Sequence, residues 1–239
     1  MEIIIQNLTK IYNKQKVLDI IDLQISKGEL VGLIGNNGAG KTTLLRLLTD
    51  LIKADSGAVF SRNKKISKTE GWKLYTSAYI DSGFLIDFLT PEEYFYFIAS
   101  NYKMNKNELE VMLDQFTDFM NGEIVGKQKY IRDFSTGNKQ KIGIIGAIIS
   151  KPEILLLDEP FNFLDPSSQY FISNYLYELN KQFRTTIIIS SHNLEYTFNI
   201  SSRILLLDKG EIIKDSSLVN NELKEELLNY FRHRYKNDK

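Results

Sequence analysis

Short apolar runs alternate with polar turns in the first part of the chain, from Met1 to about Glu29, and this pattern predicts antiparallel strands. A predicted strand at Leu30–Ile34 then leads into a predicted helix at Thr42–Leu51. Lys53–Gly57 has the composition of a turn, and a further strand is expected at Ala58–Ser61.

Strand and helix alternate again after Pro152. We predict a strand at Ile154–Leu157, a helix from Asp165 to about Phe183, and a second strand at Thr185–Ser190. Short runs that are almost wholly apolar are typical of parallel strands buried on both faces. The pattern therefore indicates an α/β fold with a mostly parallel sheet.

The pattern changes near Thr90-Pro91-Glu92-Glu93, which supplies an N-cap residue, a first-turn proline and a glutamate at the third helical position. Helical periodicity continues to about Ser150. We predict that residues 1–239 form one domain with a helical insertion at about residues 82–150. The insertion separates two segments of the core, at about residues 1–81 and 151–215.

Two short runs near the end of the chain, Arg203–Leu207 and Glu211–Lys214, predict a β-hairpin. A C-terminal helix is expected within residues 216–239. One face of it carries an apolar stripe, formed by Leu223, Leu227 and Phe231. A single stripe of this kind is typical of a helix that docks on the domain.

The composition narrows the classes of function. Lys plus Arg and Asp plus Glu are both 30, so no overall positive field attracts nucleic acid, and no nucleic-acid partner is expected. The chain has no cysteine, which excludes disulfides and thiolate chemistry and fits a reducing cytosol. No apolar run approaches the roughly 20 residues that span a bilayer, so we expect any membrane role to depend on a partner.

A glycine-rich segment between the first apolar strand and its helix carries the strongest motif. It consists of Gly35, Asn36, Asn37, Gly38, Ala39, Gly40, Lys41, Thr42 and Thr43, and it matches the full P-loop template. Its backbone N–H groups and the following helix N-terminus can bind a phosphate chain. We expect Lys41 to reach the terminal phosphates and Thr42 to bind Mg²⁺. A glycine-rich turn that binds nothing is the alternative, and the full-length match argues against it.

The predicted strand at Ile154–Leu157 ends in two carboxylates, Asp158 and Glu159. In P-loop enzymes a carboxylate at such a strand end helps to hold Mg²⁺, and an adjacent one can orient the attacking water. The alternative is a strand that ends in a polar turn. Together with Lys41 and Thr42, the pair favours a site that binds and hydrolyses a nucleoside triphosphate.

With these motifs the chain resembles the ATP-binding cassette (ABC) ATPases over nearly its whole length. Four further segments match in order: Tyr12, at the place of an aromatic that stacks on adenine; Phe134-Ser135-Thr136-Gly137-Asn138, at the signature position; Phe163-Leu164-Asp165; and Ser190-Ser191-His192, with His192 as the switch histidine. The resemblance implies a P-loop NTPase core, an N-terminal antiparallel β subdomain and an inserted α-helical subdomain. ATP and Mg²⁺ are the implied cofactors.

The resemblance also implies a head-to-tail dimer with two ATP molecules between the subunits. Each site then joins one subunit's P-loop to the signature segment of the other. Ser135 and Gly137 precede a predicted helix from Asn138 onward, whose N–H groups can bind the γ-phosphate across the interface. Within its own site, His192 is expected to contact the γ-phosphate and Glu159 to act as the catalytic carboxylate.

Two positions depart from the family pattern. The usual signature is Leu-Ser-Gly-Gly-Gln, and Thr136 replaces a glycine, so the backbone there must avoid positive φ. Asp81 aligns with a glutamine that helps to ligate Mg²⁺ and senses the partner. We expect Asp81 to be a Mg²⁺ ligand coupled to the permease. An acidic residue at this place resembles the drug and peptide-antibiotic exporter branch.

The segments Phe84–Phe88 and Tyr94–Phe97 are rich in aromatic residues. They can form part of the core of the helical region. They can equally form a socket for a cytoplasmic helix of a membrane permease, because aromatic surface patches often mark interfaces.

The resemblance implies the ATP-hydrolysing subunit of a transporter, in the export direction, with a separate transmembrane permease. The chain is expected to be cytoplasmic and peripheral to the inner face of the cell membrane. A soluble, non-transport ABC ATPase acting on ribosomes, DNA or an assembly scaffold is the alternative. The single cassette, the balanced charge and the lack of long coiled-coil insertions argue against it. A regulatory module without turnover would lack the catalytic carboxylate, whereas Glu159 is present.

Overall fold

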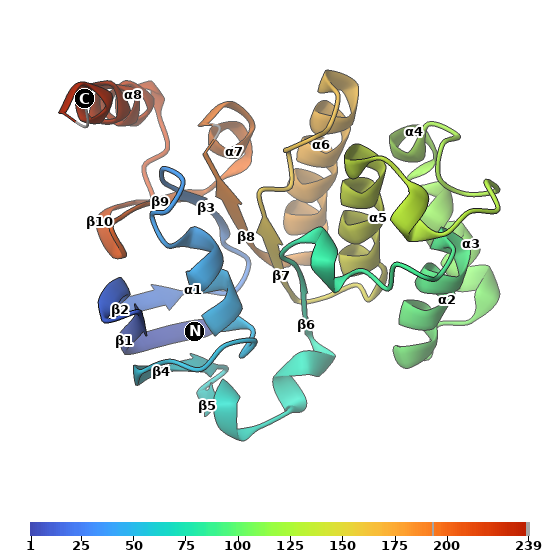
Figure 1. Ribbon diagram of the computed structural model, residues 1–239, viewed down its shortest axis with the longest axis horizontal. Helices are drawn as coiled ribbons and strands as arrows, with labels where there is room; N and C mark the ends of the chain where they lie inside the picture. The colour runs from blue at the N-terminus through green and yellow to red at the C-terminus, as the bar shows by residue number, and fades with distance from the viewer. Residues whose placement is uncertain (193, 238–239) are drawn as a thin grey trace.

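Two β-sheets and the helices packed on them make up the protein, seen here in a computed structural model that describes residues 1–192 and 194–237. One sheet has four strands in the order β2-β1-β4-β5, and the other has six in the order β10-β9-β3-β8-β7-β6. Helix α1 (Lys41–Leu48) packs against strands of both sheets (Figure 1). The predicted α/β fold, with an antiparallel sheet, a mostly parallel sheet and additional helices, is confirmed.

In the antiparallel sheet, β1 (Ile3–Tyr12) and β2 (Gln15–Ile25) form a long hairpin. Its two turn residues, Asn13 and Lys14, both have positive φ. Two-residue turns with that backbone match the right-handed twist of the flanking strands, which explains the direct pairing. The short strand β5 (Lys64–Lys65) forms the other edge of the sheet. The antiparallel strands predicted for this part of the chain are present.

Strand β4 (Ser56–Ser61) begins earlier than predicted, so the turn expected at Lys53–Gly57 was wrong in its last two residues. Gly57 has a φ of 79°, and a Cβ added there would lie 2.2 Å from the carbonyl oxygen of Asn7. The pairing of β4 with β1 shifts its register at this point. Gly57 therefore permits a close backbone approach within the sheet instead of a turn.

The larger sheet places β3 (Leu30–Ile34) between β8 (Thr186–Ser191) and β9 (Arg203–Asp208), and β7 (Ile154–Asp158) between β8 and β6 (Thr76–Tyr79). All residues of β3, β7 and β8 are buried, as expected of parallel strands covered on both faces. β6 was not predicted, because its four residues include no apolar run. The carboxyl ends of these parallel strands meet at one edge of the sheet.

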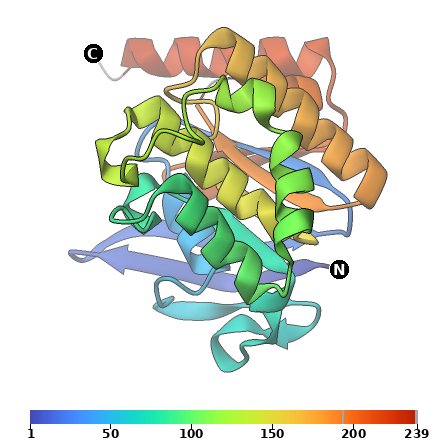
Figure 2. The ribbon, with the colours of Figure 1, turned by 90° about the vertical axis from the view of Figure 1, so that its right-hand side faces the viewer.

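The remaining elements cover the larger sheet and extend it. They are α2 (Pro91–Asn101), α3 (Lys106–Asp114), α4 (Thr117–Met120), α5 (Thr136–Ile149), α6 (Pro166–Phe183), α7 (Leu194–Ile200), β10 (Glu211–Ser216) and α8 (Asn221–Asn237), with short 3₁₀ turns at Ile66–Lys68, Gly71–Leu74, Ser82–Phe84 and Ile131–Asp133. Helices α2 to α5 lie between β6 and β7 in the sequence and gather at one end of the molecule (Figures 1 and 2). The subdomain limits near residues 82 and 150 stay predictions.

Side-chain caps fix the starts of two helices in this group. At α2, Thr90 accepts a hydrogen bond from the N–H of Glu93, whose carboxylate accepts one from the N–H of Thr90, as predicted. Helix α5 begins at Thr136, two residues before the predicted start at Asn138. Ser135 is its N-cap and accepts a hydrogen bond from the N–H of Asn138. Thr136 has helical backbone, so the positive φ of a glycine is not needed there.

Helix α8 runs along one side of the molecule (Figure 2). Leu223 and Leu227 are buried against α7 and β9, so the predicted docking face is confirmed for these two residues. Residues 238–239 of the predicted C-terminal segment lie outside the described residues. Among the described residues, every helix is too short or too polar to cross a membrane.

Candidate active site

The loop between β3 and α1 has backbone geometry that only glycine adopts readily. Gly38 and Gly40 have φ values of 81° and 110°, and Gly40 is the N-cap of α1. A Cβ added to Gly35 would lie 2.4 Å from the carbonyl oxygen of Leu207. The carbonyl of Ala39 also accepts a hydrogen bond from Gly210, in the turn after β9. The loop is therefore held rigidly at the N-terminus of a helix, where anions bind.

Lys41, the first residue of α1, points back into this loop. Its ammonium donates to the carbonyl oxygens of Gly35 at 2.7 Å and Asn36 at 3.3 Å. It also pairs with a carboxylate oxygen of Glu159 at 3.2 Å, and the Lys41 side chain is only 6% exposed. A buried ammonium in this position supplies the positive charge that a phosphate chain in the loop requires.

Thr42 and Asp158 meet across the site. The Thr42 hydroxyl donates to one Asp158 carboxylate oxygen at 2.5 Å, and the Ser190 hydroxyl donates to the other. A hydroxyl and a carboxylate oxygen in contact are the hard oxygen ligands that Mg²⁺ prefers. The two residues fit the predicted metal site, and nucleotide phosphates and water would supply the other ligands.

Glu159 follows β7 in a left-handed backbone conformation, with a φ of 48°. Its N–H donates to the carbonyl oxygen and the hydroxyl of Ser190, at 3.1 and 3.0 Å. Its carboxylate accepts from the N–H of His192 at 3.2 Å and lies 2.9 Å from His192 Nδ1. Glu159 therefore joins Lys41 and His192, and the structure brings both predicted catalytic residues together.

Ser190 was cited only as part of the switch segment, although its hydroxyl contacts Asp158 and the backbone of Glu159. It lies at the end of β8, directly opposite Asp158 in the parallel register. The sequence shows a serine at a strand end but does not reveal which strand lies next to it. The contact could have been predicted only if β8 were known to pair with β7.

The signature residues at the start of α5 differ from one another in exposure and contacts. Ser135 and Thr136 are exposed at the start of α5. Gly137 lies so close to the loop after β7 that an added Cβ would be 2.5 Å from the carbonyl oxygen of Phe163. Among the described residues, no hydrogen bond or ion pair joins Ser135 to Lys41 of its own chain.

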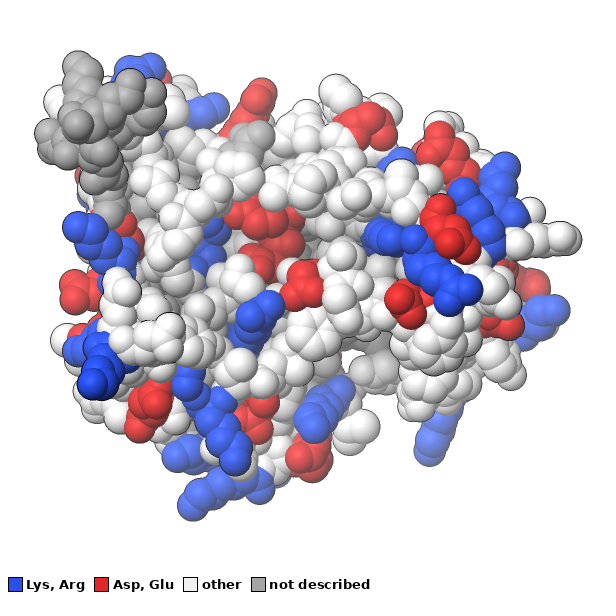
Figure 3. Space-filling model, in the orientation of Figure 1, with Lys and Arg blue, Asp and Glu red and all other residues white. Residues whose placement is uncertain are grey.

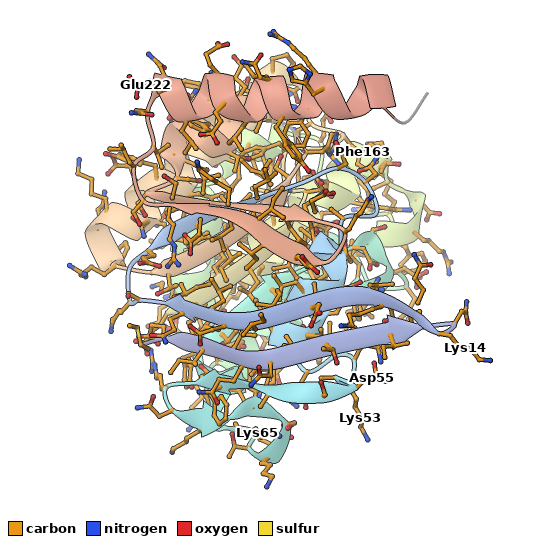
Figure 4. The ribbon with its side chains drawn as sticks, turned by 90° about the vertical axis from the view of Figure 1, so that its left-hand side faces the viewer. Lys14, Lys53, Asp55, Lys65, Phe163 and Glu222 are labelled. Carbon is orange, nitrogen blue, oxygen red and sulfur yellow. The ribbon has the colours of Figure 1, made fainter. Side chains whose placement is uncertain are left out.

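Tyr12 lies at the end of the β1–β2 hairpin with 42% of its surface exposed. The Lys10 ammonium lies 5.1 Å from the centre of its ring. Figure 4 shows Lys14, at the hairpin tip, on the same side of the molecule as Phe163, which is 70% exposed. The role of Tyr12 in stacking on adenine stays a prediction.

Asp81 follows β6 and has partners for both carboxylate oxygens. One lies 3.0 Å from Arg46, on α1, and the other accepts from the N–H of Gly83 at 2.7 Å. Arg46 had not been predicted, because nothing local in the sequence links α1 to this loop. The ion pair connects Asp81 to the helix that carries Thr42. A role of Asp81 as a Mg²⁺ ligand stays a prediction.

Charges of both signs mix on this face. Figure 3 shows acidic side chains gathered near its centre, in the region of α1, β7 and β8, with basic side chains around them. This distribution agrees with the equal numbers of acidic and basic residues in the chain.

Comparison with known families decides the identity of the fold and the site. The profile described as ABC transporter matches residues 18–162, more than half of the 239 residues. The chain belongs to the ABC transporter family. The matched part of this ABC ATPase includes the P-loop, the signature segment, Asp158 and Glu159, and it ends before His192. Membership makes the chain an ATP-binding protein that hydrolyses ATP, as predicted.

Individual relatives agree on the cassette and differ in cargo. An uncharacterized ABC transporter ATP-binding protein of Methanocaldococcus jannaschii is 35% identical over 211 residues, covering 87% of this chain and 75% of the relative. The bacitracin transport ATP-binding protein BcrA of Bacillus licheniformis is 34% identical, with 87% and 67% covered. The probable sulfate/thiosulfate import ATP-binding protein CysA of Chlorella vulgaris is 30% identical, with 91% and 92% covered. The chain spans 61% of a further relative from Synechocystis.

Solved structures confirm the fold. An ATP-binding subunit of an ABC transporter superimposes with a TM-score of 0.81 at 24% identity, covering 95% of this ABC ATPase and 93% of that chain. A dimeric ATP-binding cassette in a post-hydrolysis state, bound to ADP and Pi, gives 0.79 at 23% identity, with 91% and 99% covered.

The electrostatics of Asp158 give a testable prediction. Burial raises its pKa above the ordinary value, although hydrogen bonds from Ser190 and Thr42 act in the opposite direction. A raised folded-state pKa contributes stability below the unfolded value, and this contribution is lost as the pH rises through the folded value. We therefore expect Asp158→Asn to raise the thermal unfolding midpoint at neutral pH. This gain should shrink as the pH falls towards 3.8, the ordinary pKa of an aspartate carboxyl, because Asp158 is then protonated in the folded protein.

Asp165→Asn is the control of opposite sign. Hydrogen bonds from Ser167 and Ser168 hold the pKa of Asp165 well below its ordinary range, so this substitution should lower the midpoint at neutral pH. Scanning calorimetry across the pH range measures both variants. A lower midpoint for Asp158→Asn at neutral pH would contradict the assignment.

Proposed function

We propose that this ABC ATPase hydrolyses Mg²⁺-ATP as a head-to-tail dimer and drives export through a separate membrane permease. The observation that supports it most directly is the cluster at the ends of β3, β7 and β8. There Lys41, Thr42, Asp158, Glu159 and His192 are linked by hydrogen bonds and ion pairs at one end of a P-loop. Each has the chemistry that triphosphate hydrolysis requires.

In this proposal the P-loop amides and Lys41 would bind the phosphates, and Thr42 and Asp158 would hold Mg²⁺. The metal would neutralise charge between the β- and γ-phosphates. Glu159 orients a water for in-line attack on the γ-phosphorus and accepts its proton. His192, hydrogen-bonded to the Glu159 carboxylate, fixes that carboxylate and donates to the γ-phosphate. Bond cleavage to the β-phosphate oxygen releases ADP and inorganic phosphate.

The dimer follows from where the signature segment lies. Ser135 is exposed at the N-terminus of α5, a helix of 14 residues, and the N-terminus of a helix is suited to an anion. A second protomer in head-to-tail orientation would bring this helix end to the γ-phosphate held by the first. Phe163, exposed beside Gly137, would lie in the same interface. Two of the similar solved cassettes are described as dimeric.

The permease would dock where α2 and α5 meet β6. A groove of about 540 Å³ lies there, lined by Leu74, Ala78, Tyr94, Ile98, Tyr102 and Gly146 among others. In the aromatic segments, Phe95 is fully buried whereas Phe84, Phe88, Tyr96 and Phe97 are exposed, so both predicted roles have residues available. We propose a short amphipathic helix of the permease as the occupant, because apolar and aromatic side chains line the groove together with the polar Lys73, Ser77 and Asn101.

The direction of transport rests on the resemblance to the exporter branch at Asp81 and the signature segment. Relatives named for bacitracin transport and a relative named for sulfate/thiosulfate import share the same cassette, so the cassette alone does not set the direction. Docking on a permease would place the chain at the cytoplasmic face of the membrane.

The catalytic assignment predicts the behaviour of Glu159→Gln. We expect ATP turnover to fall by about 100-fold or more, since a positioned general base typically contributes that much. Binding of ATP should persist, because Lys41 and the P-loop are unchanged. Phosphate release and nucleotide binding are measured in parallel, with Glu178→Gln on the exposed face of α6 as the control. Turnover equal to that of the unaltered chain would remove Glu159 from the mechanism.

The proposed docking site predicts that Leu74→Glu weakens binding to the permease. Leu74 is 78% exposed and lines the groove, so a charge there should prevent an apolar helix from seating. The matched control is Leu218→Glu, at a residue that is 70% exposed in the segment before α8.

Each variant is co-expressed with a polytopic membrane protein that co-purifies with the unaltered chain, and is purified from detergent extracts. Only Leu74→Glu should lose the membrane protein, while both isolated variants keep their ATPase rate. Full recovery of the membrane protein with Leu74→Glu would show that the groove is not the docking site.

A further inference from the structure

A buried chain of hydrogen bonds reaches the backbone of the proposed catalytic residue. The Tyr79 hydroxyl at the end of β6 lies 3.1 Å from Oε1 of Gln140, on α5. Nε2 of Gln140 donates to the carbonyl oxygen of Glu159 at 2.9 Å. Both Tyr79 and Gln140 are buried. The chain therefore joins three separate elements, β6, α5 and the end of β7.

Chemistry fixes the direction of these two bonds. The carbonyl oxygen of Glu159 can only accept, so the NH₂ group of Gln140 must face it. The amide oxygen of Gln140 then faces the Tyr79 hydroxyl, which must donate. Without Tyr79, one end of the amide would lose its partner and the side chain could rotate away.

Glu159 needs such support because its backbone is strained. A φ of 48° is uncommon for a residue with a side chain and costs about 1 kcal/mol. Ser190 holds the N–H of Glu159, and the N–H of Asn162 binds its carbonyl within the following turn. Gln140 is the side chain that holds this carbonyl from outside the turn.

The packing of α5 on β6 favours the same geometry. Gly143, about one turn after Gln140, lies against the Tyr79 ring so closely that an added Cβ would be 2.0 Å from it. Because Gly143 has no side chain, the Tyr79 ring packs directly against the backbone of α5, and its hydroxyl reaches the amide of Gln140. Tyr79 and Gln140 are therefore fitted to each other by the helix as well as by the hydrogen bond.

We propose that Gln140 is a positioning residue for hydrolysis, held by Tyr79, which fixes the backbone of Glu159 and so the aim of its carboxylate. The proposal rests on the catalytic role proposed for Glu159. Gln140 and Ser135 lie on α5 little more than one turn apart. A helix end that contacts the neighbouring protomer's ATP thus also sets the carboxylate of its own site.

Gln140→Leu keeps the side-chain volume and removes both hydrogen bonds. We expect kcat for ATP to fall by about 10- to 100-fold, the loss typical of a misplaced catalytic group, with KM and nucleotide affinity unchanged. Tyr79→Phe removes only the hydroxyl and should lower kcat less. The matched control is Tyr175→Phe, which removes a Tyr–Gln hydrogen bond of the same 3.1 Å length between α6 and Gln115 at the end of α3.

The pH profile of Gln140→Glu separates positioning from general destabilisation. A carboxylate can accept from Tyr79 but cannot donate to the carbonyl of Glu159, whereas a protonated carboxyl can do both. We expect the rate of this variant, relative to the unaltered chain, to recover as the pH falls. A structural defect would leave the ratio flat or make it worse at low pH.

These outcomes distinguish two failures. If Glu159→Gln retains turnover, the catalytic assignment fails, and the positioning proposal fails with it. If Glu159→Gln is inactive while Gln140→Leu and Tyr79→Phe keep the kcat of the unaltered chain, only the positioning role is overturned. Should Gln140→Leu fail to fold, Tyr79→Phe and Gln140→Glu still decide the matter.

Discussion

The contact between the buried Lys41 ammonium and the Glu159 carboxylate joins the two halves of the site, and the proposed chemistry depends on it. The lysine comes from the P-loop helix and the carboxylate from the end of β7, and the two side chains lie 3.2 Å apart. Parallel strands bring these segments together because their carboxyl ends share one edge. A left-handed backbone at Glu159, held by Ser190 and Gln140, turns the carboxylate towards the lysine.

That contact also explains how the site can respond to nucleotide. Lys41 is bonded to loop carbonyls and to Glu159, all of which a bound phosphate would compete with for the ammonium. In the proposed mechanism, the Glu159 carboxylate becomes available to a water once Lys41 binds phosphate. The first two turns of α5 contact both the surface and the site, since Ser135 is exposed while Gln140 donates a hydrogen bond to the carbonyl oxygen of Glu159. In the proposed dimer, one helix thus connects the chemistry of a site with the surface that meets a neighbour.

The sequence predicted those parts of the molecule that local patterns determine. The P-loop, the capping box at Thr90, the buried strands and the carboxylate pair all depend on neighbouring residues in the chain. Strand β6 was not predicted, because its four weakly apolar residues show no strand pattern. Its place at the edge of the sheet depends on its pairing with β7. The roles of Ser190, Arg46 and Gln140 could not be predicted from the sequence, because each depends on which strands and helices lie side by side. The bonds Arg46–Asp81, Ser190–Asp158 and Gln140–Glu159 join residues 35, 32 and 19 positions apart.

Sedimentation velocity on Glu159→Gln tests the shared-site account most directly, because slow hydrolysis should let the ATP-bound dimer persist. The account predicts a dimer with Mg²⁺ and ATP and a monomer with ADP. It also predicts that adding Ser135→Arg abolishes the dimer while ATP binding to the monomer persists, since only the neighbour's γ-phosphate contact is blocked. A dimer that ignores the nucleotide, or one that forms equally well with Ser135→Arg, would contradict the account.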